Sequence, residues 1–143
     1  MEEIVIDGSG KVLGRLASSV AKMLLEGKRV ALLNAEKILI SGSKSDIIKK
    51  YKARIELKDK ANPEHSPYWS RRPDLFAKRV IRGMLPYKKA RGKSAYRLLR
   101  VYIGIPSAYA NARHVEIGGK NPKEMHADTL TIGSLMRLLG YKG

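Results

Sequence analysis

The chain has 143 residues, of which 43% are hydrophobic, so it is long enough for one domain with a buried core and too short for two comfortable domains. This hydrophobic content excludes a disordered basic tail. Lysine and arginine total 29 against 13 acidic residues, and the formal net charge of +16 is most simply explained by a polyanionic partner, with nucleic acid ahead of an anionic membrane.

Signals for a membrane or for secretion are missing from the sequence. No apolar run approaches the roughly 20 residues of a membrane-spanning helix, and neither a signal peptide nor a lipidation motif is visible. Without cysteine, the chain can form neither a disulfide framework nor a thiolate metal site. We therefore expect a cytoplasmic protein with no membrane partner.

The beginning of the chain predicts a strand, a turn and a helix. Residues 3–7 (EIVID) alternate and are rich in β-branched side chains, which is typical of a strand, and residues 8–10 (GSG) are typical of a turn. From Leu13 onward, apolar side chains recur at the spacing of an amphipathic helix, which we expect to stop at Gly27.

Two short apolar runs and a basic helix follow. Residues 30–33 and 38–40 predict buried strands. Ser45 is a plausible N-cap for a basic helix that runs to about Leu57. The inner face of that helix is predicted to carry Ile47, Tyr51 and Ile55.

The second half of the chain begins with a polar stretch, residues 58–72, that predicts a long loop. Pro73 suits the first turn of a helix to about residue 85, and residues 92–98 predict another short helix. Residues 100–103 predict a strand, and residues 131–139 a terminal helix. This order favours an α/β domain with a small, mostly parallel sheet covered by helices.

Positive charge is concentrated between Arg71 and Arg100. This segment holds eleven cations and one acid, Asp74, so it carries 11 − 1 = +10 of the total charge. Its cations are Arg71, Arg72, Lys78, Arg79, Arg82, Lys88, Lys89, Arg91, Lys93, Arg97 and Arg100.

Tyrosines 87, 96 and 102 and several glycines interrupt the basic segment, which favours nucleic acid over a merely solvated basic face. The sequence has no helix-turn-helix, zinc-finger or RNP motif, so folded RNA recognised by its shape and phosphates is the expected ligand.

The turn at residues 8–15 resembles a nucleotide-binding loop, but its spacing fails. The dinucleotide fingerprint has Leu13 where it needs its third glycine, and the Walker A pattern has Val5 where it needs its first. The three histidines fall into no metal-binding pattern. We therefore expect no enzyme activity, no catalytic residue, no cofactor and no metal, although Lys11 and Arg15 remain candidates for RNA phosphates.

Several blocks together resemble the thirteenth family of large-subunit ribosomal proteins. The blocks are residues 6–18, 33–37, 40–44, 71–74, 83–86 and 99–104. Residues 104–106 (GIP) and 87–93 (YKKARGK) resemble the archaeal and eukaryotic branch of that family.

The resemblance implies a three-layer α/β/α fold around a four-stranded sheet, in a single RNA-binding domain over residues 1–143. We expect the core at about residues 1–104 and a C-terminal extension at about 105–143. It also implies a structural, non-enzymatic role in the large subunit of the cytoplasmic ribosome, with direct binding to its ribosomal RNA, support of subunit assembly and translation, and neighbouring large-subunit proteins as further partners. No small-molecule substrate is expected.

The residues carried over as RNA-binding candidates are all cationic. They are Lys11, Arg15, Lys37, Lys44, Arg71, Arg72, Arg79, Arg82, Lys88, Lys89, Arg91, Lys93 and Arg97. Two alternatives stay open from the residues alone, namely a nucleotide-dependent enzyme that uses the turn at residues 8–15, and a general nucleic-acid compaction protein.

Overall fold

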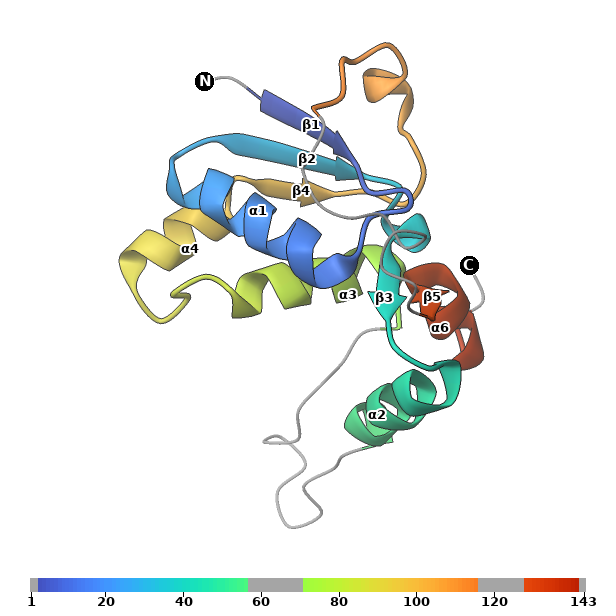
Figure 1. Cartoon of the computed structure of the whole chain (residues 1–143). Coiled ribbons are helices and arrows are strands. Elements are labelled where there is room, and N and C mark those ends of the chain that lie inside the picture. The colour runs from blue at the N-terminus through green and yellow to red at the C-terminus, as the bar shows by residue number, and fades with distance from the viewer. Residues whose placement is uncertain (1–2, 57–70, 116–127, 142–143) are drawn as a thin grey trace.

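Figure 1 shows the chain as a computed structural model, and the structure describes residues 3–56, 71–115 and 128–141. Most of the loop predicted at residues 58–72 therefore lies outside the described residues, as does Leu57 at the expected end of the basic helix.

The centre of the fold is a three-stranded sheet of β1 (Glu3–Asp7), β2 (Arg29–Leu33) and β4 (Leu99–Val101). The strands are in the order β1-β2-β4, and both pairs are parallel. β2 is the middle strand, and four of its five residues are buried, which is why its sequence is a continuous apolar run and does not alternate.

Three helices cover one face of this sheet, namely α1 (Leu13–Leu25), α3 (Pro73–Gly83) and α4 (Ala90–Tyr96) (Figure 1). The apolar stripe predicted for α1 is confirmed, because the residues at helical spacing are buried and Gly27 follows the helix with a φ of +87°. The buried residues of α1 are Leu13, Leu16, Ala17, Val20, Ala21 and Leu24.

The other face of the sheet is covered by the chain after β4. Val5, Ala31 and Leu33 form a small apolar cluster there. Tyr102 and Tyr109 pack against this cluster, the latter from the 3₁₀ turn η3 (Ser107–Tyr109). The hydroxyl of Tyr109 donates to Glu3 Oε2 at 3.2 Å, which joins this cover to β1.

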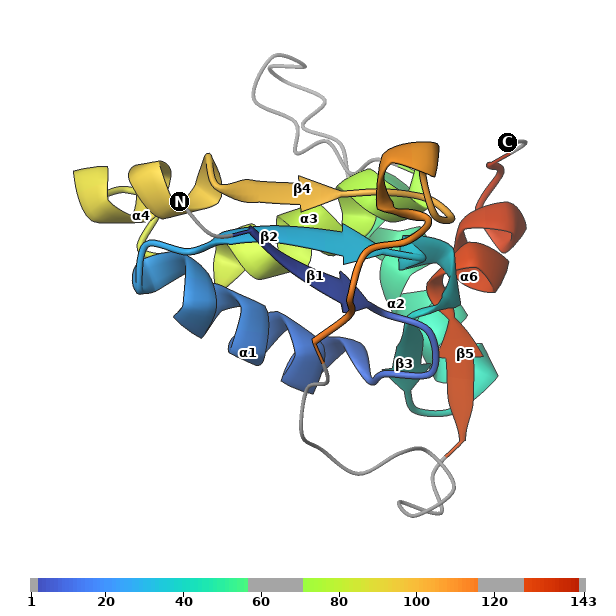
Figure 2. The ribbon, with the colours of Figure 1, turned by 90° about the horizontal axis from the view of Figure 1, so that it is seen from above.

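A second, smaller unit lies beyond the carboxyl ends of the three strands (Figure 2). β3 (Leu39–Ser41) pairs antiparallel with β5 (Thr129–Thr131), and β5 leads directly into α6 (Ile132–Leu138). The hydroxyl of Thr131 accepts from the Ser134 N–H at 3.1 Å and so caps α6. The 3₁₀ turn η1 (Ala35–Lys37) connects β2 to β3.

The helix α2 (Lys44–Glu56) follows β3. Its first turn is capped by Ser43, whose hydroxyl accepts from the Asp46 N–H at 3.3 Å, and not by the predicted Ser45. Two of its predicted inner residues, Ile47 and Tyr51, are buried, whereas the side chain of Ile55 lies outside the described part of the chain.

The predicted α/β class and small, mostly parallel sheet are confirmed, with a correction to the strand count. The parallel sheet has three strands where the resemblance implied four, because β3 pairs with β5 in a separate ladder. The extension expected from residue 105 also contributes to the core, since Ile132, Leu135 and Met136 of α6 belong to the main apolar cluster.

Candidate nucleic-acid interface

The helix α3 presents opposite faces to the core and to the surface. Phe76, Ala77 and Ile81 are buried at helical spacing. Arg82, one residue on from Ile81, is exposed, so its guanidinium group points away from the packed side.

A cationic surface, here called the α3–α4 surface, runs from α3 through the turn at residues 84–89 and along α4. Its residues are Lys78, Arg79, Arg82, Lys88, Lys89, Arg91, Lys93 and Arg97. All except Lys78 and Arg79, which are partly buried, are exposed.

Tyrosines hold the α3–α4 surface together. The guanidinium carbon of Arg82 lies 4.4 Å from the centre of the Tyr87 ring, and Lys78 Nζ lies 5.0 Å from the centre of the Tyr96 ring. The two rings meet edge to face, with centres 5.5 Å apart. Because a cation over an aromatic face is attracted to it, the four side chains restrain one another and the turn between the helices.

Gly92 allows α4 to pack directly on the turn at residues 84–89. A Cβ atom at Gly92 would overlap the backbone of Pro86 and Tyr87, so no larger residue fits without movement. The turn is further closed by the Lys89 N–H, which donates to the Pro86 carbonyl at 2.9 Å, and it is anchored by the buried Leu85. The cations of this turn therefore extend from a fixed backbone.

The helix α2 adds cations that the sequence analysis did not select. Lys50 and Arg54 lie over the ring of Tyr51, at 5.4 and 5.3 Å from its centre, and Tyr51 packs edge to face on Phe76 of α3. Burial lowers the pKa of Arg79, and the nearby charges of Arg82 and Arg54 lower it further. The run KKYKAR at residues 49–54 was the available signal for this contribution.

The thirteen predicted RNA-binding residues do not form one patch. Seven belong to the α3–α4 surface, and the other six lie where helices begin or in η1. These six, here called the helix-start group, are Lys11, Arg15, Lys37, Lys44, Arg71 and Arg72. α1 and α3 both begin near the carboxyl edge of the sheet and run back along it, so the start of α3 and the helix α4 lie toward opposite ends of the helical layer (Figure 1).

Within the helix-start group, backbone hydrogen bonds bring two segments together. The Gly10 N–H donates to the Lys37 carbonyl at 3.2 Å, and the Leu39 N–H donates to the Lys11 carbonyl at 2.8 Å. Lys11 and Lys37 are thus on adjoining segments. Arg72 forms an ion pair with Asp74 at 3.0 Å at the start of α3.

The N–H groups of Gly8 and Gly10, in the turn at residues 8–11, already donate hydrogen bonds to other parts of the protein. The Gly8 N–H donates to the Leu33 carbonyl at 2.9 Å, and the Gly10 N–H is used by Lys37 as described above. A Cβ atom at Gly8 would lie 2.6 Å from Cγ1 of Ile38. These amides and this glycine therefore attach the turn to the end of β2 and to the η1 segment, which weakens the interpretation of the turn as a nucleotide site.

Asp7 fixes the same region from β1. Its Oδ1 accepts from the Ser9 N–H and from Asn34 Nδ2, each at 2.9 Å. Burial would raise the pKa of Asp7, but the hydrogen bonds from Asn34 and Ser9 and the charge of His114 outweigh it and lower the pKa below the usual 3.8. The carboxylate has a structural explanation and needs no catalytic one.

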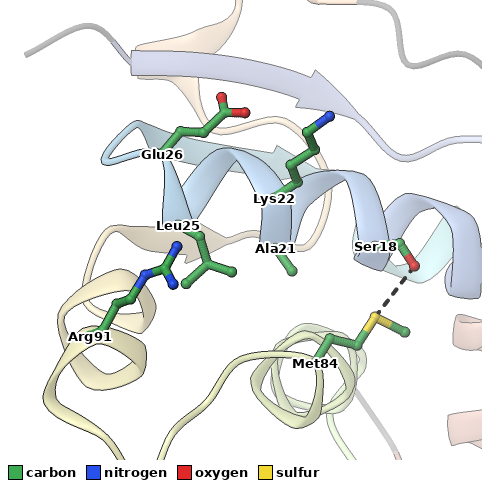
Figure 3. A pocket seen from close by; sticks show the side chains of 7 residues that line it. All are labelled: Ser18, Ala21, Lys22, Leu25, Glu26, Met84 and Arg91. Carbon is green, nitrogen blue, oxygen red and sulfur yellow. Dashed lines mark hydrogen bonds between the residues drawn. The ribbon is translucent and has the colours of Figure 1, made fainter.

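A groove lies between the second half of α1 and the turn after α3 (Figure 3). Ala21, Leu25 and Met84 give it an apolar floor, and Lys22 and Arg91 are at its edge. The hydroxyl of Ser18, which also lies 2.9 Å from the Gly14 carbonyl, approaches Met84 Sδ at 3.7 Å across the groove.

Within the described ranges, no three histidine, cysteine or acidic side chains come close enough to hold a metal ion. None of the helices described has the length and apolar composition needed to cross a bilayer.

The fold and its surface define a class, that of a small α/β protein with fixed cations and tyrosines on one surface. Comparison with known proteins narrows the class. The model of the family described as ribosomal protein L13 matches residues 1–108. The chain therefore belongs to the ribosomal protein L13 family, and the resemblance found in the sequence is confirmed.

The individual relatives agree with this assignment. The chain is 45% identical to the large ribosomal subunit protein uL13 of Methanosphaera stadtmanae, over 96% of this chain and 97% of that one. It is 46% identical to its counterpart in Methanococcoides burtonii, over 96% and 98%. The counterpart in Archaeoglobus fulgidus is 40% identical, over 97% and 88%.

The relatives are archaeal, as the resemblance to the archaeal and eukaryotic branch predicted. The family is one of ribosomal proteins and not of enzymes, which agrees with the expected non-enzymatic role.

Proposed function

We propose that this protein is a structural constituent of the large subunit of the cytoplasmic ribosome, where it binds large-subunit ribosomal RNA directly and supports assembly of the subunit. The observation that carries the proposal is the α3–α4 surface, whose cations extend from a backbone fixed by Gly92, Leu85 and the tyrosine pair. Membership of the ribosomal protein L13 family supports it.

The cations of this protein suit the phosphates of RNA. Arg54 of α2 lies near Arg79 and Arg82 of α3, and because like charges repel, these cations are best accommodated beside a polyanion. Each phosphate that a lysine or arginine neutralises releases counterions, which makes binding strong at low salt and steeply dependent on salt. Cations held at fixed spacing can select the shape of a folded RNA, because its phosphates also have fixed spacing.

Neighbouring large-subunit proteins are the second class of partner in this proposal. Several large apolar side chains are exposed on the protein alone, including Leu75, Ile105 and Leu138, at 43%, 47% and 53% of their surface. Contact with other components of the subunit would remove these side chains from water.

The test compares two double variants of equal charge in binding to a large-subunit rRNA transcript. Lys88→Gln with Lys89→Gln removes two exposed cations from the α3–α4 surface, and Arg113→Gln with Arg137→Gln removes two exposed cations elsewhere. We expect the first variant to lose affinity and to reduce the slope of log K against log salt by about 2, and the second to resemble the wild type.

Equal losses in the two variants would show that net charge alone drives binding, as expected for a general compaction protein. In that case, duplex DNA and unrelated RNA of the same length would also compete as well as the ribosomal transcript. Either result would overturn the proposed specific role.

A further inference from the structure

A small pocket lies beside the turn that joins α3 to α4. Its lining combines an apolar floor with a cationic edge, and consists of Arg82, Gly83, Leu85, Pro86, Tyr87, Lys88 and Lys89. Its volume of about 460 Å³ falls within the usual range of small-molecule sites, about 300–1,000 Å³.

We propose that this pocket binds one unpaired nucleobase of the RNA, stacked beside the Arg82–Tyr87 pair, while Lys88 and Lys89 bind the flanking phosphates. The proposal rests on the proposed RNA-binding function and deepens it. Phosphate contacts alone position an RNA, whereas a base pocket requires a nucleotide that is free to leave its helix.

The chemistry of the lining fits a base. Tyr87 is partly buried and its ring meets the ring of Tyr96 at nearly a right angle, so the Tyr87 ring is restrained before any ligand arrives. Arg82 lies over the same ring at 4.4 Å, and aromatic and guanidinium planes are the two surfaces on which unpaired bases stack in proteins. Leu85 and Pro86 add apolar contact.

The cations around the pocket are suited to bind the phosphates of the same nucleotide. Arg82, Lys88 and Lys89 are exposed and line one pocket, so a base that entered it would bring its phosphates close to three cations. The groove in Figure 3 lacks this combination, because no aromatic side chain lines it.

Gly83 lines the pocket, and a larger side chain can be added there without a steric conflict. It is exposed at the end of α3, and a Cβ atom built there meets no other atom within 4 Å. In binding to a large-subunit rRNA transcript, we expect Gly83→Leu to weaken affinity by about 5- to 150-fold, the range of base–aromatic stacking. Ala108→Leu adds a similar side chain to the exposed η3 turn, on the other face of the sheet, and is expected to bind like the wild type.

Tyr87 provides a second pair of variants. Tyr87→Leu is expected to lose affinity in the same range with an unchanged salt slope, because no phosphate contact is removed, whereas Tyr87→Phe keeps the ring and the affinity. Ultraviolet crosslinking of the wild-type complex followed by trypsin is expected to leave a nucleotide on the peptide of residues 83–88.

Unchanged affinity in a folded Gly83→Leu variant would overturn the pocket while leaving RNA binding by the wild type intact. A reduced salt slope in Tyr87→Leu would also overturn it, because the ring would then act only by placing a cation. If Tyr87→Leu does not fold, Gly83→Leu decides the question. Failure of the wild type to bind the transcript at all would refute the proposed function itself.

Discussion

At the scale of single residues, Asn34 joins segments at the ends of three strands. It is 4% exposed and has a left-handed backbone with φ of +57°, a conformation that asparagine adopts more readily than most residues. Its side chain donates to Asp7, and its N–H donates to the Gly104 carbonyl at 3.0 Å. One residue thus connects the ends of β1, β2 and β4.

The Asp7–Asn34 contact predicts how stability depends on pH. Because the folded pKa of Asp7 is lowered, its contribution is complete above the unfolded pKa and is lost as pH falls through the lowered value. We expect the free energy of unfolding of the wild type to fall more steeply below about pH 4 than that of Asp7→Asn, which has no carboxylate at this position. Urea denaturation between about pH 6 and pH 2 measures the difference, and parallel curves would contradict it.

Gly92 gives a second prediction at this scale. Gly92→Ala is expected to destabilise the protein by about 1–3 kcal/mol, because its Cβ atom would meet backbone that cannot rotate away. Gly14→Ala is the matched control, since it lies in α1 with nothing within 4 Å of the new atom, and it should gain roughly 0.5–1 kcal/mol. Thermal or urea unfolding compares them, and equal effects would mean that α4 does not pack on the turn.

At the scale of elements, sequence periodicity and turn residues predicted the helices, because a helix depends on residues that are near one another in the chain. The spacing of Leu16, Val20 and Leu24 predicted α1, and Pro73 marked the start of α3. The three-residue strand β5 was missed, because Thr129–Thr131 is too short to show a period and pairs with residues far back in the chain. The partner of β3 was unpredictable for the same reason.

The residues that make up the candidate interface could be predicted from the sequence, but the contacts between them could not. The cationic residues of the basic segment were visible in the sequence, yet the pairing of Arg82 with Tyr87 depends on how the turn after α3 folds. The approach of Arg54 to Arg79 depends on the packing of Tyr51 against Phe76, which brings α2 and α3 together. Contacts of this kind are decided by tertiary structure and leave no local pattern.

The sequence alone did not reveal how much the helix α6 contributes to the hydrophobic core. Met136 is fully buried, and we expect Met136→Ala to cost about 2–5 kcal/mol through the cavity that it leaves. Leu138→Ala, on the same helix, is the control, because Leu138 is 53% exposed and its loss should cost little. Denaturant unfolding distinguishes them, and a small effect at Met136 would mean that α6 is only loosely attached.

At the scale of the whole molecule, charge opposes folding. A net charge of +16 on 143 residues repels itself, and the free protein has no polyanion to relieve the repulsion. Ribosomal RNA would supply the opposite charge in the assembled state, so the isolated protein is expected to be less stable than the bound one.

Salt should therefore stabilise the free protein while it weakens RNA binding. We expect the midpoint of thermal unfolding to rise as sodium chloride is raised from about 0.01 M to about 1 M, over which the Debye length shortens from about 30 Å to about 3 Å. A variant with Lys88→Gln, Lys89→Gln and Lys93→Gln should show a smaller rise, because less repulsion remains to be screened. A midpoint that is independent of salt in both proteins would contradict this prediction.

The pairing of β3 with β5 also affects how the protein is made. Leu39 is synthesised long before Thr131, its partner, and η1 long before α6, which packs on it. A nascent chain that has emerged from the ribosome only as far as β4 therefore lacks the part of its core that α6 supplies. We therefore expect the core to be completed only when residues 129–138 have emerged, so that the last part of the chain decides when folding can finish.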